Sequence, residues 1–162
     1  MEEVHPSGRI AMREMRGNLW QKHAEGHWIV VTTNPIIAYG RNPRGEVVMG
    51  RGIARQTRDK FPGFAERFAE DIRARGNHVF AYPDVRIITF PVKSHWRDAA
   101  ELPLIERSCQ ELVELVGRQL PGKEVYLPRP GCSNGRLAWS DVKPILQKCL
   151  DDRFVVCDLA AP

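Results

Sequence analysis

The sequence predicts an α/β fold in which strands and helices alternate around a largely central sheet. Trp28–Thr32 is a short, continuous run of β-branched and aromatic residues, typical of a buried strand. Further along, apolar residues recur at spacings of three and four, which predicts an amphipathic helix. These residues are Leu102, Ile105, Cys109, Leu112 and Val116. Segments of both kinds alternate along the chain, and such alternation is typical of layered α/β folds.

The predicted strands follow from short apolar segments bounded by turn residues. An edge strand is expected at residues 10–15, and further strands at 28–32, 78–82, 85–90, 124–127 and 153–158. Ile36–Tyr39 and Glu46–Met49 are expected to pair as a hairpin around Asn42–Gly45.

Four helices are predicted, at residues 52–60, 64–75, 101–118 and from Ser140 onward. Gly76 and Asn77 can stop the second helix. Ser140 is a favourable N-cap for the fourth, and Pro144 is tolerated in a first helical turn.

Length and composition indicate a single domain over residues 1–162, since 162 residues suit one hydrophobic core. No apolar run reaches the ~20 residues of a membrane helix, and the N-terminus lacks the pattern of a secretory signal. The four cysteines form no Cys-x-x-Cys pair, and the histidines lack metal-ligand spacing. We therefore expect a cytoplasmic protein with reduced thiols, no metal and no cofactor. The net charge of +4 permits an anionic partner without requiring one.

Three loops follow predicted strands, and ligands of α/β folds bind where loops leave the carboxyl ends of strands. The loops are Thr32–Gly52, Phe90–Arg97 and Pro128–Trp139. The first ends in Gly50 and Gly52 before a helix, where free N–H groups can bind a diphosphate, although a tight turn explains the glycines equally well. The third loop can present several N–H donors to phosphate, or serve as a rigid connector.

Lys93 follows the end of a predicted strand in the middle loop. A lysine in a partly dry cleft near other cations can act as a nucleophile because its pKa is lowered. A solvated surface lysine is the commoner alternative.

The combined blocks resemble the macro domain family over almost the whole chain. They are Arg16–Leu19, Val30–Asn34, Val48–Ala54, Phe90–Trp96 and Leu127–Trp139, and their order and spacing are specific together. The chain looks most similar to the branch that contains terminal ADP-ribose protein glycohydrolase and the macro domain of the DarG antitoxin. The resemblance implies a three-layer α/β/α fold with a central mixed sheet, and recognition of ADP-ribose.

The resemblance also implies positions for the ligand. Asn18 stands where many members have an aspartate that binds the adenine amino group, and Asn34 matches a residue near the distal ribose. Residues of two phosphate loops complete the implied site. The substrate-binding residues are Asn18, Leu19, Asn34, Gly50, Arg51, Gly52, Ile53, Ala54, Gly131, Cys132, Ser133, Asn134 and Gly135.

Lys93 matches the lysine that this branch uses at the distal ribose carbon, either as a nucleophile or to stabilise charge. Gly135 stands where the protein glycohydrolase has a catalytic aspartate. The implied activity is removal of mono-ADP-ribose from acidic residues of proteins or from DNA bases, by a monomer that does not bind membranes. Two alternatives stay open: a non-catalytic reader of ADP-ribose, and a phosphatase acting on ADP-ribose 1″-phosphate.

Overall fold

The computed structural model describes residues 3–40 and 42–158. Its main sheet has the strand order β1 (Arg13–Arg16), β8 (Phe154–Asp158), β7 (Val125–Pro128), β2 (Trp28–Thr33), β6 (Ile87–Pro91) and β5 (Phe80–Tyr82). All neighbours are parallel except β5 and β6, which are antiparallel. The predicted mixed central sheet is therefore confirmed, with β1 at one edge.

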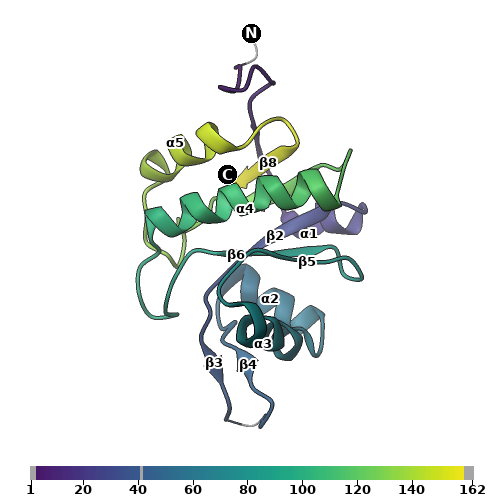
Figure 1. The fold of residues 1–162 in the computed structure, drawn as a ribbon, viewed down its shortest axis with the longest axis vertical. Coiled ribbons are helices and arrows are strands. Elements are labelled where there is room, and N and C mark those ends of the chain that lie inside the picture. Colours follow the sequence, from purple (N-terminus) through teal and green to yellow (C-terminus); the bar gives the residue numbers. More distant parts are fainter. Residues whose placement is uncertain (1–2, 41, 159–162) are drawn as a thin grey trace.

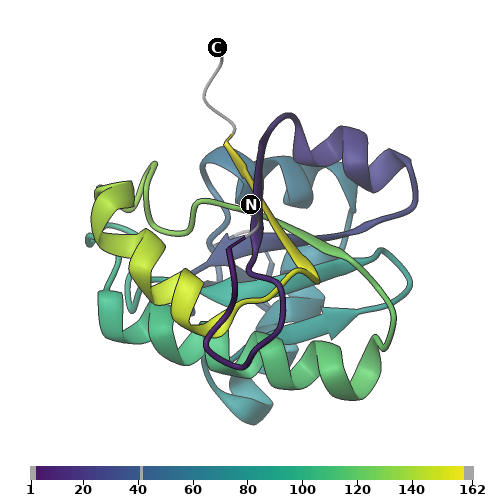
Figure 2. The same ribbon diagram turned by 90° about the horizontal axis from the view of Figure 1, so that it is seen from above.

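Helices cover both faces of this sheet, which makes three layers (Figures 1 and 2). One face packs against α1 (Leu19–Ala24), α2 (Gly52–Lys60) and α3 (Phe64–Arg75), and the other against α4 (Leu102–Gln119) and α5 (Trp139–Cys149).

Strand β2 supplies both cores because successive side chains point to opposite faces. Trp28 and Val30 join the core under α4 and α5, whereas Ile29 and Val31 join the core under the other helices. A continuous apolar run is what a central strand covered on both sides requires.

Two helices begin and end where the sequence pattern predicts, at 52–60 and 64–75. The prediction for α5 was wrong in its first turn: Ala138 is the N-cap, so Ser140 lies inside the helix. Pro144 consequently falls in the second turn, where its ring removes one helical hydrogen bond. Helix α1 was not predicted, since six residues are too few to show helical periodicity.

The predicted hairpin is present and short. Strands β3 (Ile37–Ala38) and β4 (Glu46–Val47) pair antiparallel and project from the sheet beside α3 (Figure 1). Arg44 holds the hairpin to α3 through ion pairs with Glu66 at 2.8 Å and Glu70 at 2.9 Å.

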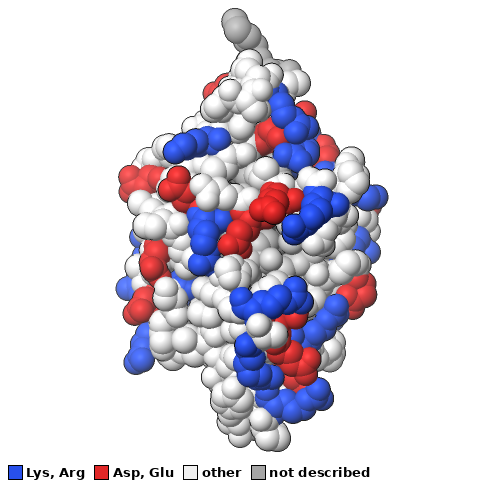
Figure 3. Space-filling model, viewed as in Figure 1, with Lys and Arg blue, Asp and Glu red and all other residues white. Residues whose placement is uncertain are grey.

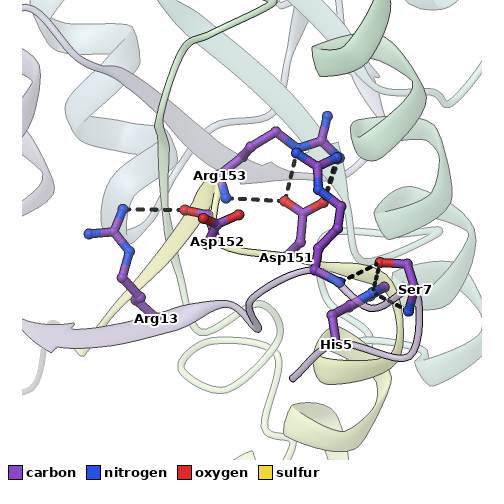
Figure 4. Close-up of polar contacts among 7 residues, drawn as sticks. His5, Ser7, Arg13, Asp151, Asp152 and Arg153 are labelled. Carbon is purple, nitrogen blue, oxygen red and sulfur yellow. Dashed lines mark hydrogen bonds and ion pairs between the residues drawn. The ribbon is translucent and has the colours of Figure 1, made fainter. Parts of the chain in front are cut away.

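The N-terminal segment is tied to the turn before β8 by the carboxylate of Asp151. Arg153 donates to this carboxylate at 2.8 and 2.9 Å (Figure 4). Arg9 approaches the same carboxylate at 3.3 Å. Burial alone would raise the pKa of Asp151, but the hydrogen bonds from Arg153 outweigh it and the pKa is lowered.

Charges of both signs are interspersed over the face seen in Figure 3. All four cysteines have free thiols. None of the described helices is long and apolar enough to cross a bilayer. Within the described ranges, no three histidine, cysteine or acidic side chains gather as metal ligands would.

Candidate functional site

A cavity lies at the carboxyl ends of the central strands. Strands β7, β2 and β6 are adjacent and parallel, so the loops that follow them leave the same edge of the sheet. These are the three loops that the sequence singled out. Together they line a cavity of about 700 Å³, large enough for a nucleotide-sized ligand.

The first wall of the cavity is the beginning of α2. Gly52 has a φ of 55°, which favours glycine, and its missing Cβ leaves room for the Asn134 side chain of the opposite loop. Among the described residues, the N–H groups of Gly52, Ile53 and Ala54 donate no hydrogen bond. A helix that begins with free N–H groups favours an anion.

The second wall is the loop Gly131–Gly135, which is folded tightly on itself. The oxygen of Gly131 accepts from Leu137 at 2.9 Å, and that of Gly135 accepts from Ala100 at the same distance. The N–H groups of Ser133 and Asn134 have no acceptor in the described part of the chain. The cavity is thus faced by free donors from two sides, a suitable arrangement for a diphosphate.

Gly135 is the position where a catalytic aspartate would stand. A Cβ there would lie 2.5 Å from the oxygen and 2.7 Å from the Cα of Gly131, and 2.8 Å from Cβ of Ala100. Two of these atoms belong to the backbone, so this loop conformation excludes any side chain at position 135.

Lys93 lies where the middle loop meets the second wall. Its Nζ donates to the carbonyl oxygens of Trp96 at 3.2 Å and of Asn134 at 3.1 Å. Burial and then the nearby charges of Arg136 and Arg51 lower its pKa, and Asp98 opposes this shift only in part. The site therefore favours the neutral amine more than solvent does.

A neutral amine has two hydrogens and one lone pair. Because two carbonyl oxygens already accept from the Lys93 Nζ, the lone pair of the neutral form remains for an electrophile in the cavity. Cys132, whose thiol also lies on the wall, is unsuited to attack, since burial raises the pKa of this thiol to about 11.

Asn34 and Thr33 line the cavity at the end of β2. The amide of Asn34 donates to the oxygen of Val48 and accepts from the N–H of Ile36, each at 2.9 Å, so it closes the base of the hairpin. The Thr33 hydroxyl is buried and has no partner among the described residues. An unsatisfied buried hydroxyl on a cavity wall is a candidate ligand contact.

The end of the cavity away from Lys93 is formed by residues that sequence reasoning missed. The Arg129 guanidinium lies 4.8 Å from the centre of the Trp139 ring and 3.5 Å from the carboxylate of Asp158. Asp158 reaches the cavity because β8 is parallel to β7 and ends at the same edge. Asp158 is the polar residue that ends the last predicted strand, and this is the sequence signal that could have pointed to it.

Most of the predicted site residues come together in this cavity. Its wall includes Asn34, Gly50, Arg51, Gly52, Ile53, Ala54, Lys93, Gly131, Cys132, Ser133, Asn134 and Gly135.

Asn18 and Leu19 do not line the cavity. Leu19 is fully buried, and the Asn18 oxygen caps α1 by accepting from Trp20 at 2.8 Å. The adenine contact of Asn18 stays a prediction and would need its oxygen to accept a second hydrogen bond.

No protein-family model matches the sequence. The curated DNA ADP-ribosyl glycohydrolase of Thermus aquaticus is 29% identical over 149 residues, or 86% of this chain and 38% of the relative. The chain spans well under half the length of the curated relatives it matches.

Two solved structures resemble the chain closely in fold. The macrodomain of Thermus aquaticus DarG has a TM-score of 0.72 and 27% identity, covering 93% of this chain and 98% of the other. The macrodomain of Mycobacterium tuberculosis DarG has a TM-score of 0.70 and 26% identity, covering 91% and 97%.

The layered α/β/α fold with its mixed central sheet is that of a macro domain, as these neighbours show. Within that class, the chain is similar in both sequence and structure to the macro domain of DarG.

Proposed function

We propose that this macro domain hydrolyses the bond between ADP-ribose and a modified DNA base. The names of the curated relatives support DNA rather than acidic protein side chains as the carrier. The observation that carries the proposal is the position of Lys93, held by two backbone carbonyls at the edge of a cavity lined with free N–H groups.

The two phosphate walls determine the orientation of the ligand. The diphosphate lies between the first turn of α2 and the loop Gly131–Gly135. The distal ribose then points toward Lys93, and the adenosine toward Arg129, Trp139 and Asp158. At that end the Asp158 carboxylate can accept from the adenine amino group, with the charge assistance that Asn18 lacks.

In the proposed reaction the neutral Nζ of Lys93 attacks C1 of the distal ribose. A C–N bond forms and the bond from C1 to the base breaks. The base leaves with the electron pair and takes up, through water, the proton that the alkylated Nζ loses. The ring then opens to an imine, which water hydrolyses to free ADP-ribose and the restored lysine.

No aspartate assists this lysine in the proposed mechanism. Among the described residues no carboxylate is hydrogen-bonded to the Lys93 Nζ, and Gly135 has no room for one. The lowered pKa of Lys93, caused by burial and by neighbouring guanidinium groups, takes the place of a general base.

The test is a hydrolysis panel with ADP-ribosylated DNA, ADP-ribosylated glutamate peptides and ADP-ribose 1″-phosphate. We expect release from DNA by the wild type and loss of at least ~100-fold in Lys93→Ala, the size of effect typical of a catalytic group. Borohydride added during turnover should attach ADP-ribose covalently to the wild type and not to Lys93→Arg.

Each other outcome identifies a different function. Undiminished release of ADP-ribose by Lys93→Ala removes the lysine from the mechanism. Release by the wild type without a borohydride adduct, together with loss of activity in Lys93→Ala, assigns the lysine a charge-stabilising role. Tight ADP-ribose binding without any turnover identifies a reader, and phosphate release identifies a phosphatase. The proposal also includes a cytoplasmic location and a monomeric state. Sedimentation of the purified chain tests whether it is a monomer.

A further inference from the structure

Trp96 is an unusual residue at the mouth of the cavity. Its side chain is 47% exposed although it lines the cavity, and the other large apolar side chains exposed in the described part of the chain, Val4, Ile10 and Tyr39, lie elsewhere. Tryptophan is enriched at binding interfaces, because its indole offers a large apolar face together with one polar N–H group.

The backbone around Trp96 is firmly placed. The Trp96 oxygen accepts from the Lys93 Nζ, and the Arg97 oxygen accepts from Arg136 at 2.9 Å. The turn that contains Trp96 closes by a hydrogen bond from the N–H of Asp98 to the His95 oxygen at 3.1 Å. The indole therefore sits on an ordered rim next to the reacting end of the cavity.

The rim carries positive charge. Arg51, Arg97 and Arg136 are all exposed beside the mouth, and the Arg97 guanidinium lies 5.7 Å from the centre of the Trp96 ring. Asp98 is the acidic group that acts on Lys93 from this side. The combination of a free aromatic face and several guanidinium groups suits a chain of phosphates and bases.

We propose that Trp96, Arg97 and Arg136 form a docking rim for single-stranded DNA on either side of the ADP-ribosylated base. This rests on the proposed function. Trp96 stacks on a neighbouring base, and the two arginines contact backbone phosphates. The strand is single because an indole reaches the face of a base only where the base is not stacked in a duplex.

Binding is measured in the Lys93→Gln background, where turnover is removed while the Gln amide can still donate to a carbonyl. The probe is a fluorescent single-stranded oligonucleotide with one ADP-ribosylated internal base, and the reference ligand is free ADP-ribose. Trp96→Ala should weaken oligonucleotide binding about 5- to 150-fold, the range for loss of one stacked base, and by much less for ADP-ribose. Trp96→Phe should restore most of the affinity.

Matched controls separate the rim from general surface effects. Tyr39→Ala removes another exposed aromatic that does not line the cavity and should leave both affinities unchanged. Arg97→Ala should lower the slope of log K against log salt by about 0.7, the value for one phosphate contact on a single strand, whereas Arg118→Ala on α4 should not.

Equal losses for the oligonucleotide and free ADP-ribose overturn the rim proposal, as does an unchanged oligonucleotide affinity in Trp96→Ala. A larger loss with an ADP-ribosylated peptide than with DNA overturns it too, in favour of a protein carrier. Failure of the proposed function is distinguishable, because wild-type turnover of DNA is measured separately and does not enter these affinities.

Discussion

The substitution Gly135→Ala probes how closely the second phosphate wall is packed. Its new Cβ would lie 2.5 Å from the oxygen of Gly131, so the loop must move by about 0.9 Å to reach an ordinary contact of ~3.4 Å. A forced shift of packed backbone typically costs about 1–3 kcal/mol. In a chain of 162 residues that corresponds to a loss in Tm of about 2–12 °C.

The same shift should weaken ADP-ribose binding. The oxygens of Gly131 and Gly135 hold the loop through Leu137 and Ala100, and the Asn134 oxygen holds Lys93, so moving the loop misplaces its free N–H groups. We expect Kd to rise by tenfold or more, measured by calorimetry.

The matched control is Gly40→Ala, where a Cβ meets nothing within 4 Å and Tm should change by no more than about 2 °C, since surface substitutions rarely exceed about 0.5 kcal/mol. A Gly135→Ala protein with the Tm and Kd of the wild type would refute the packing argument. It would also reopen position 135 to a catalytic side chain.

Further predictions concern titration, stability and base recognition. The kcat/KM for DNA should rise with pH through the lowered pKa of Lys93. Arg136→Gln should move this rise in the pH profile to higher pH, because it removes a cation that disfavours the protonated amine. An unchanged pH profile in Arg136→Gln contradicts this assignment. Asp151→Asn should destabilise the fold by about 3 kcal/mol in urea unfolding, since it leaves Arg153 without its charged partner. The pKa of Asp151 is lower in the folded state than in the unfolded state. The difference in unfolding free energy between the wild type and Asp151→Asn should therefore be present above the unfolded pKa of about 3.9 and disappear as the pH falls through the folded pKa. A difference that persists below the folded pKa would exclude the ion pair as its cause. Asp158→Asn should weaken ADP-ribose binding about five- to tenfold through loss of one charge-assisted hydrogen bond. The affinity for the inosine analogue, which lacks the amino group, should change little. Equal losses of affinity for both ligands would place Asp158 outside base recognition.

The fold was largely predictable from local patterns. Continuous apolar runs and helical spacing located the central strands and the helices α2 to α4, because those elements are long or buried enough for periodicity to show. Helix α1 escaped because it is short and depends on one cap, Asn18. The beginning of α5 was misplaced because Ser140 looks like a cap, yet the helix begins at Trp139 with Ala138 as its N-cap and no side-chain cap hydrogen bond.

The site was predictable where it is contiguous in sequence. The glycine loops and Lys93 follow predicted strands, which made them candidates, and the resemblance to the macro domain family selected them. Trp139 and Asp158 were missed. The only sequence signal for Asp158 is its place as the polar end of the last predicted strand, and its position on the wall depends on β8 pairing parallel to β7. The position of Trp139 depends on the direction in which α5 leaves the loop. Asn18 differs from the other predicted residues because its side chain caps α1 outside the cavity wall, so its adenine contact stays a prediction.

The cavity joins parts of the chain that are far apart in sequence. Lys93 contacts Asn134 across 41 positions, and the Asn134 side chain packs into the space left by the missing Cβ of Gly52, in a loop that leaves a different strand. Such contacts form only once long loops have closed, so a binding-competent cavity requires the folded chain. ADP-ribose should therefore bind the native state alone and stabilise it as a whole, by about 2.7 kcal/mol at a hundred times Kd. Hydrogen exchange should then slow in strands remote from the ligand, as well as in the loops that touch it.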